Sequence, residues 1–157
     1  MIPTLLPQPS SQSTFLQLAL IFVLFSIIRI ADILIYIFFQ DCVFNKLRSD
    51  TALKVSFQGV MRVVGNSKCN RWYFKFNGNE CNGPMTIEAI VYNDWPSGNP
   101  NLHHHRSFEG YCENIPQGAV RVELWVGQCG SQTLGDAFTG WISVSRIMVE
   151  EVSRPQS

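Results

Sequence analysis

Five cysteines in a chain of 157 residues constrain its fold more than any other feature of the sequence. No two of them are spaced as Cys-x-x-Cys, the spacing that zinc knuckles and thioredoxin-type redox motifs require. Disulfide bonds are the better interpretation, and such bonds persist in secreted proteins, whereas cytosolic proteins are kept reduced. The sequence therefore predicts an extracellular, secreted domain. The disulfide candidates are Cys42, Cys69, Cys81, Cys112 and Cys129.

The pairing of these cysteines is only partly constrained by the sequence. Cys112 and Cys129 flank the expected strand 119–126, whose residues extend roughly 26 Å at ~3.3 Å each. Because a disulfide needs Cα atoms within about 7 Å of one another, a bond between Cys112 and Cys129 is disfavoured. The odd count leaves one cysteine over, which either pairs with another chain or keeps a free thiol.

Alternation of apolar and polar residues predicts a series of β-strands. In the run 119–126, every second residue from Val120 to Val126 is apolar and is expected to face the core, while Arg121 and Glu123 face outward. Turn-rich connections and the lack of a convincing amphipathic helical pattern favour an all-β fold, a β-sandwich or jelly roll. The longest irregular region is the loop 93–118. The expected strands are 53–57, 72–76, 85–92, 119–126 and 144–152.

The aromatic run 72–76 allows two interpretations. A base-stacking strand would need a basic groove, and the chain balances 12 basic against 12 acidic residues, so no nucleic-acid partner is expected. Alternation places Trp72, Phe74 and Phe76 on one face, as the core of a sandwich requires. We therefore expect these three side chains to be buried.

Candidate catalytic and metal-binding residues are scarce. The three histidines are adjacent at 103–105, and side chains alternate in an extended segment, so at most two of them point the same way. A catalytic metal needs further ligands, and nothing enforces convergence of Glu109 or Glu113 on this segment. A polar loop is the expected structure. A Gly-x-Ser-x-Gly elbow is absent, and 127–131 is only superficially similar, so we expect no enzyme activity, catalytic residue, cofactor or metal.

The first 40 residues form a hydrophobic lead with conflicting targeting signals. Residues 15–28 are almost uniformly apolar and have the length of a signal-peptide core, yet no Lys or Arg precedes them. The longer segment 15–39 suffices to span a bilayer, but Arg29 and Asp32 interrupt it. Basic residues on its C-terminal side would also leave the cysteine-rich domain in the cytosol. A signal peptide, a signal-anchor, a membrane span and a segment not native to the mature protein all stay open.

A set of short segments spread over residues 41–152 carries a resemblance to a known family. The longest is RWYFKFNGNECNGP at 71–84, followed by IEAI at 87–90. With the segments below, it resembles the C-terminal globular domain of the collagen triple helix repeat-containing protein 1 family. The other segments are Cys42, Phe44, Lys46, Arg48-Ser49, Ala52-Leu53 and Gly59 upstream, and Glu109-Gly110 with Cys112-Glu113, Trp125-Val126-Gly127 with Cys129, Gly135-Asp136-Ala137, Thr139-Gly140-Trp141, Ser143-Val144-Ser145-Arg146-Ile147 and Glu150-Glu151 downstream.

The resemblance implies a secreted glycoprotein of the extracellular matrix whose C-terminal domain is a jelly roll of the complement and tumour-necrosis-factor type and forms a homotrimer. It implies roles in limiting collagen deposition, promoting cell migration and assisting Wnt–Frizzled signalling, with matrix or Wnt/Frizzled proteins as partners. The chain departs from the family in three ways. Its hydrophobic lead replaces a short collagenous stretch, Lys68-Cys69 replaces a Cys-Cys doublet, and no Asn-x-Ser/Thr acceptor is present.

The sequence thus predicts a hydrophobic lead at 1–40, a globular β domain at 41–152 and a disordered tail at 153–157. The main hypothesis is a secreted, non-enzymatic matrix protein that acts by binding other proteins. The alternative is a membrane-tethered adhesion or receptor-like β-sandwich module anchored by 15–39. Side chains expected to be exposed, such as Arg121, Glu123 and Arg146, do not by themselves mark a partner surface.

Overall fold

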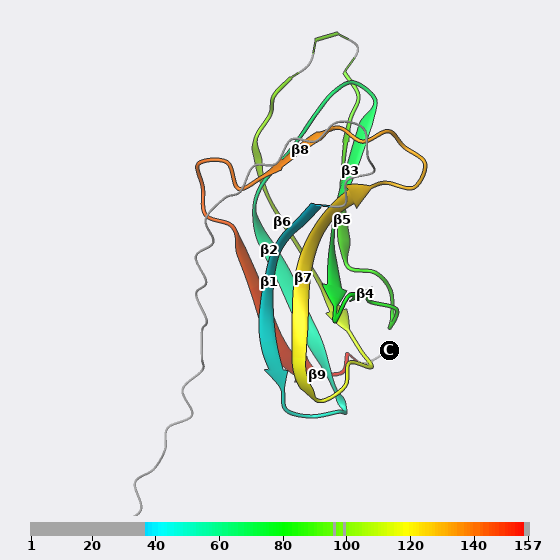
Figure 1. Cartoon of the computed structure of the whole chain (residues 1–157), viewed down its shortest axis with the longest axis vertical. Coiled ribbons are helices and arrows are strands. Elements are labelled where there is room, and N and C mark those ends of the chain that lie inside the picture. The colour runs from blue at the N-terminus through cyan, green and yellow to red at the C-terminus, as the bar shows by residue number, and fades with distance from the viewer. Residues whose placement is uncertain (1–36, 96, 99, 156–157) are drawn as a thin grey trace, which may run out of the picture.

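The computed structural model describes residues 37–95, 97–98 and 100–155, which form a sandwich of two antiparallel β-sheets (Figure 1). This confirms the all-β sandwich predicted from the alternation of the sequence. Side chains are described from residue 39 onward. The strands are β1 (Ile37–Lys46), β2 (Thr51–Val64), β3 (Lys68–Phe76), β4 (Asn79–Glu80), β5 (Glu88–Asn93), β6 (His104–Cys112), β7 (Gly118–Gln128), β8 (Asp136–Thr139) and β9 (Arg146–Ser153).

Each sheet is organised around a long strand. Sheet A runs β1-β7-β3, and both β4 and β5 pair with the far edge of β3. Sheet B is centred on β2, which pairs with β6 along one edge and with β8 and β9 along the other. The 14 residues of β2 are enough for β9 to pair with its first part and β8 with its last part.

The core lies between the sheets and is built from the inward positions of β2, β3 and β7. Trp72, Phe74 and Phe76 are at most 4% exposed, which confirms the prediction that they are buried. Successive residues of a strand face opposite sides, so an inward row needs an apolar residue at every second position. The sequence supplies such rows in all three strands. Other buried members of the core are Leu53, Val55, Phe57, Met61, Val120, Val122, Leu124 and Val126.

One hydrogen bond joins the two sheets inside this core. The indole Nε1 of Trp72 in β3 donates to the hydroxyl of Thr139 in β8 over 2.7 Å, and both side chains are buried. A buried N–H without an acceptor would cost about 1–3 kcal/mol. The threonine therefore allows a tryptophan to occupy the centre of the sandwich.

The first strand begins inside the predicted hydrophobic lead. β1 starts at Ile37, ahead of the domain boundary expected at residue 41, and pairs with β7. Residues 1–36, which contain most of the proposed anchor 15–39, lie outside the described residues. Within the described part of the chain, no helix is long and apolar enough to cross a membrane.

An irregularity in β1 explains why its strand pattern is missed. The pairing register with β7 shifts between Phe38 and Gln40, so the strand bulges there. Because a bulge adds a residue to one strand, the inward positions on its two sides no longer alternate strictly. The inward residues of β1 are Phe39, Cys42 and Phe44, which pack against the core.

The loop predicted at 93–118 contains a strand, so that part of the prediction was wrong. β6 pairs with β2 over its whole length, from Cys112 opposite Leu53 to His104 opposite Met61. Its exposed side chains are largely polar, which hides the strand from a search for apolar alternation. The strand forms because an edge of β2 offers unpaired backbone groups. Smaller differences are that β5 spans 88–93 rather than 85–92, and β9 includes Ser153 from the predicted tail.

Candidate functional site

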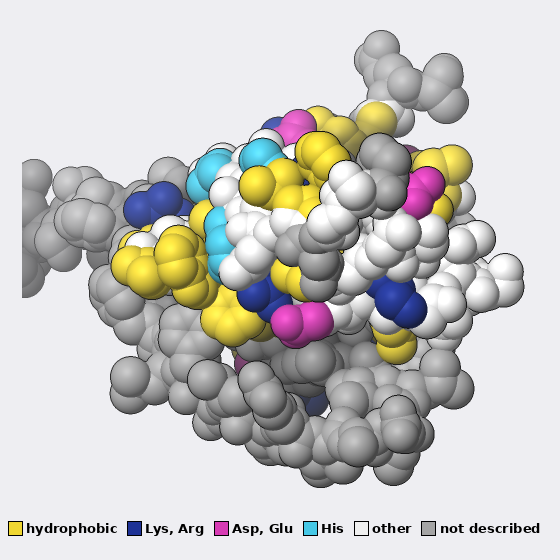
Figure 2. All heavy atoms as spheres, turned by 90° about the horizontal axis from the view of Figure 1, so that it is seen from above, with side chains coloured by type: hydrophobic (Ala, Val, Ile, Leu, Met, Phe, Trp, Pro, Cys, Tyr) yellow, Lys and Arg dark blue, Asp and Glu magenta, His cyan; other side chains and the backbone are white. Residues whose placement is uncertain are grey.

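The histidine segment lies at the upper end of the sandwich, next to apolar side chains (Figure 2). His104 and His105 open β6 and do not belong to a loop, because β2 supplies their backbone partners. His103 stacks on the indole of Trp141, with 4.2 Å between ring centroids. Among the described residues, no group of three His, Cys, Asp or Glu side chains is placed to hold a metal ion. His103 therefore packs against an aromatic ring, whereas His104 and His105 are exposed strand residues.

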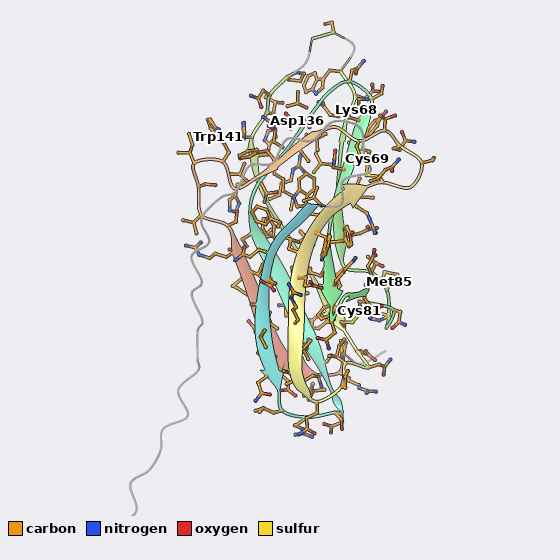
Figure 3. The ribbon with its side chains drawn as sticks, viewed as in Figure 1. Lys68, Cys69, Cys81, Met85, Asp136 and Trp141 are labelled. Carbon is orange, nitrogen blue, oxygen red and sulfur yellow. A yellow bond between two sulfur atoms is a disulfide. The ribbon has the colours of Figure 1, made fainter. Side chains whose placement is uncertain are left out.

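Four of the five cysteines form two disulfides. Cys69 of β3 pairs with Cys129, which directly follows β7, so this disulfide lies within sheet A. Cys81, after β4, pairs with Cys112 at the end of β6, and this second disulfide joins sheet A to sheet B. Both pairs have Cα atoms 5.7 Å apart. Cys69 lies nearer the upper end of the sandwich than Cys81 (Figure 3). The disfavoured bond between Cys112 and Cys129 does not occur.

The remaining cysteine, Cys42, keeps a free thiol in the described structure. It faces the core from β1, opposite Val122 of β7, and is half-buried. Burial raises the pKa of the thiol, and the negative charge of Asp41 raises it further. Because the thiolate is the reactive form, Cys42 is a poor nucleophile. Cys69, in contrast, is bonded despite the lysine that precedes it.

The outer face of sheet A carries interleaved aromatic and basic side chains. The guanidinium carbon of Arg71 lies 3.9 Å from the ring centroid of Tyr73, and the Lys75 ammonium lies 4.3 Å from that of Trp125. Such cation–π contacts are typically worth about 0.5–1 kcal/mol at exposed sites. Tyr73 is only 1% exposed although it points away from the core. The stacked cations are what shield it from water.

Carboxylates hold Arg71 in place over the tyrosine ring. Its guanidinium donates to Glu80 of β4 and, over 2.8 Å, to Glu88 of β5. Partial burial on its own lowers the pKa of Arg71, but the hydrogen bonds and charges of Glu80 and Glu88 outweigh it and raise that pKa above its usual range. Arg71 is thus a fixed, permanently charged group at the centre of this face.

Exposed apolar residues surround this ladder of cations and rings. Val43, Ile90 and Tyr92 are each more than half exposed. Ile90 also lines an open hollow, together with Gln128 and the disulfide-bonded Cys129. We name the whole surface the sheet A face. Its residues are Val43, Arg71, Tyr73, Lys75, Glu88, Ile90, Tyr92, Arg121, Trp125, Gln128, Cys129 and Gly130.

Glu123 differs from the sequence prediction. Its neighbour Arg121 is exposed as expected and bonds to Asp41 over 2.6 Å. Glu123 lies on the same outer face but is only 4% exposed, so the prediction that it is solvated was wrong. The turn after β3 covers it, because the backbone N–H of Gly78 donates to its carboxylate over 3.1 Å. Arg146, in β9, is exposed as expected.

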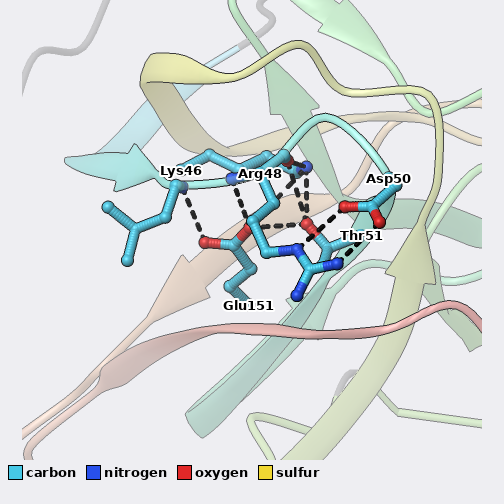
Figure 4. A network of polar contacts seen from close by, with 6 residues as sticks. Lys46, Arg48, Asp50, Thr51 and Glu151 are labelled. Carbon is cyan, nitrogen blue, oxygen red and sulfur yellow. Dashed lines mark hydrogen bonds and ion pairs between the residues drawn. The ribbon is translucent and has the colours of Figure 1, made fainter.

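A polar network closes the opposite end of the sandwich (Figure 4). The carboxylate of Glu151 accepts the backbone N–H groups of Leu47 over 2.7 Å and Arg48 over 2.9 Å, and also the hydroxyl of Thr51. Its oxygen lies 3.9 Å from the ammonium of Lys46, whose side chain is fully buried. The network fixes the turn between β1 and β2.

Sequence reasoning missed the sheet A face and this network. Alternation does place Arg71, Tyr73 and Lys75 on one side of β3, opposite the core residues. That signal could have found half of the ladder. Trp125 joins it only through the pairing of β3 with β7, and Glu151 is 105 positions from Lys46, so neither contact has a local signature.

No solved structure matches this chain. A family model described as CTHRC1, C-terminal domain, matches residues 35–149. The matched range starts just before β1 and ends within β9, so it contains the whole of sheet A with its outer face, both disulfides, and sheet B except the end of β9. The chain therefore belongs to the CTHRC1 C-terminal domain family.

Proposed function

We propose that this chain is an extracellular, non-enzymatic protein of the matrix that acts by binding other proteins. The observation that carries the proposal is the family match over residues 35–149. The two disulfides support it, because such bonds persist outside the cell and stabilise small secreted domains. By resemblance to the family, the specific roles proposed are control of collagen matrix deposition, of cell migration and of Wnt–Frizzled signalling.

We further propose that the chain forms a homotrimer and that the sheet A face takes part in its protein contacts. Tyrosine, tryptophan and arginine are the residue types most enriched at binding hot spots, and this face presents Tyr92, Trp125 and Arg71 together. The rings of Tyr73 and Trp125 are held by stacked cations, so little freedom of these side chains would be lost on binding. Ile90, at 55% exposure, adds apolar area at the same place.

Sedimentation velocity of the secreted protein, with and without reductant, tests both parts. We expect a trimer in both conditions, because the fifth cysteine is a half-buried thiol that faces the core and no interchain disulfide is needed. Ile90→Asp with Tyr92→Asp should reduce the trimer to monomer and weaken capture by immobilised collagen or Frizzled ectodomain. Met148→Asp, an exposed apolar position on β9 of sheet B, is the matched control and should change neither. A wild-type protein that stays monomeric at micromolar concentration would overturn the trimer.

The second candidate is a membrane-tethered adhesion or receptor-like module, favoured by the apolar run 15–39. Alkaline carbonate extraction of membranes from expressing cells separates it from the first. A tethered chain stays with the membrane pellet. A secreted chain is recovered from the medium, and its N-terminal residue, read by peptide mapping, reports whether the lead has been removed.

A further inference from the structure

A tight turn between β8 and β9 presents apolar side chains to solvent. The backbone N–H of Ser143 donates to the carbonyl of Gly140 over 3.2 Å, so Trp141 and Ile142 occupy the two corners of a β-turn. Trp141 is 47% exposed and Ile142 is 87% exposed, and Val144 follows at 55%. We call residues 139–145 the Trp141 turn.

The backbone of Ile142 is in a conformation that isoleucine rarely adopts. Its φ is 47°, in the left-handed region where glycine and asparagine are preferred. A β-branched residue there is strained, and such strain persists where the residue serves something other than stability. Packing within the fold does not offset this strain, because the side chain of Ile142 is almost fully exposed. We therefore infer that the apolar side chain at this corner contacts another molecule.

The tryptophan beside it is held in a fixed position. Its ring stacks on His103 with an interplanar angle of 28°, and His103 in turn meets the edge of Phe138 at 6.3 Å. Arg62 lies over the other aromatic ring of this group, 5.4 Å from the centroid of Phe138, and bonds to Asp136. Trp141 is thus a rigid protrusion at the side of the upper end (Figure 3).

The turn itself carries no formal charge, and Asp136, the acidic residue that precedes it in β8, is paired with Arg62. Residues 139–145 contain no Asp, Glu, Lys or Arg. Arg146 follows directly, and Arg106 lies in β6, across β2 from the turn; both are exposed, and within the described residues neither makes an ion pair. Figure 2 shows the apolar and histidine side chains of this end next to one another. The result is an uncharged apolar tip with an arginine rim.

We propose that the Trp141 turn inserts into the surface of a phospholipid bilayer that carries anionic headgroups. A small protruding tip suits a fluid acyl boundary, where tryptophan is preferred at the polar–apolar interface. An uncharged turn avoids the high cost of placing a charge in hydrocarbon. Arg106 and Arg146 complement anionic headgroups beside the inserted tip. This surface is distinct from the sheet A face, so the inference does not depend on the proposed protein contacts.

Quenching of tryptophan fluorescence by lipids brominated on their acyl chains tests the insertion. The full chain can be used, because all four tryptophans lie at position 72 or beyond and the hydrophobic lead contributes no signal. With vesicles of phosphatidylcholine and phosphatidylserine, we expect strong quenching of the wild type and its loss in Trp141→Phe. Each of Arg106→Gln and Arg146→Gln should raise the lipid concentration needed for half-maximal quenching about fivefold, on anionic vesicles alone.

Ile142→Gly separates binding from folding. Glycine relieves the left-handed strain, so the variant should melt no lower than the wild type while quenching falls. Ile90→Ser, on the sheet A face, is the matched control and should quench normally. Equal quenching on neutral vesicles, or quenching that survives Trp141→Phe, overturns the proposal. The proposal is also overturned if the wild type shows no quenching and Ile142→Gly loses self-association. That result would assign the turn to a contact between copies of the chain.

Discussion

Replacing Glu151 with glutamine tests the network that closes the turn between β1 and β2. In the wild type, the carboxylate accepts two backbone N–H groups and a hydroxyl and faces the buried ammonium of Lys46. Glutamine has nearly the same shape but carries no charge, and its amide NH₂ cannot accept a hydrogen bond. The substitution therefore leaves a buried cation without its counter-charge and at least one backbone donor without its acceptor.

The expected loss of unfolding free energy follows from burial. Breaking a buried ion pair by removing one partner costs about 3–5 kcal/mol. We place the cost near the lower end, at about 3 kcal/mol, since the Glu151 side chain is 13% exposed and Lys46 keeps its bonds to the carbonyl of Arg48 and the hydroxyl of Thr51. With a urea dependence of about 1–3 kcal/mol per molar, the unfolding midpoint should fall by at least about 1 M.

Urea denaturation with disulfides intact, followed by tryptophan fluorescence, measures this shift. Arg48→Gln is the matched control, because it removes the exposed ion pair with Asp50 but keeps the backbone N–H that bonds to Glu151. Lys46→Met combined with Glu151→Gln should cost less than the sum of the two single changes. Strict additivity, or a Glu151→Gln midpoint equal to that of the wild type, would refute the reasoning.

The pH dependence has a definite sign. Burial raises the pKa of Glu151, but hydrogen bonds from Thr51, Leu47 and Arg48 and the charge of Lys46 outweigh it, so the net pKa lies below the ordinary value of 4.5. The group stabilises the fold fully above pH 4.5, and this contribution is lost as the pH falls through the lowered pKa. The stability gap between wild type and Glu151→Gln should therefore close on acidification.

Three other predictions concern the cysteines and the core. A thiol reagent should find one thiol per unreduced, denatured chain and none in Cys42→Ser, and it should react slowly with the native protein because burial raises the pKa of that thiol. Replacing Cys81 and Cys112 together by alanine should cost about 3–4 kcal/mol in chemical denaturation, from the entropy of an open loop of 31 residues. Trp72→Phe should leave the hydroxyl of Thr139 without its partner and lower the unfolding free energy by about 1–3 kcal/mol, measured by thermal melting.

The strands with strict apolar alternation were predictable, and the others were not. In β2, β3 and β7 the apolar core residues recur at every second position along the strand, so the core could be predicted from the sequence. β1 was hidden by its bulge, and β6 by polar residues such as His105 and Ser107. Both depend on backbone pairing with a distant strand, which carries no side-chain signature.

The candidate surfaces divide in the same way. One side of β3 could be assigned from alternation, which gives Arg71, Tyr73 and Lys75 a common face. The partner of Lys75 on β7 required the sheet order. The exposure of Ile142 depends on its positive φ angle. No residue pattern predicts that angle, since isoleucine is disfavoured in the left-handed region. At Ile142, this departure from sequence preference is the observation from which we infer a contact outside the fold.

The pairing of β2 also has a consequence for synthesis of the chain. The strands that pair with β2, namely β6, β8 and β9, are all synthesised after it. In the same way, β1 cannot pair until β7 has been synthesised. About 80 residues separate the end of β2 from the start of β9, which takes roughly 4–16 s at ribosomal speed. Both edges of β2, the most apolar strand of sheet B, stay open until β6 has been made, and the part of its other edge that β9 occupies stays open to the end of that interval. The nascent chain is thus most prone to associate with its neighbours before its last strand has been translated.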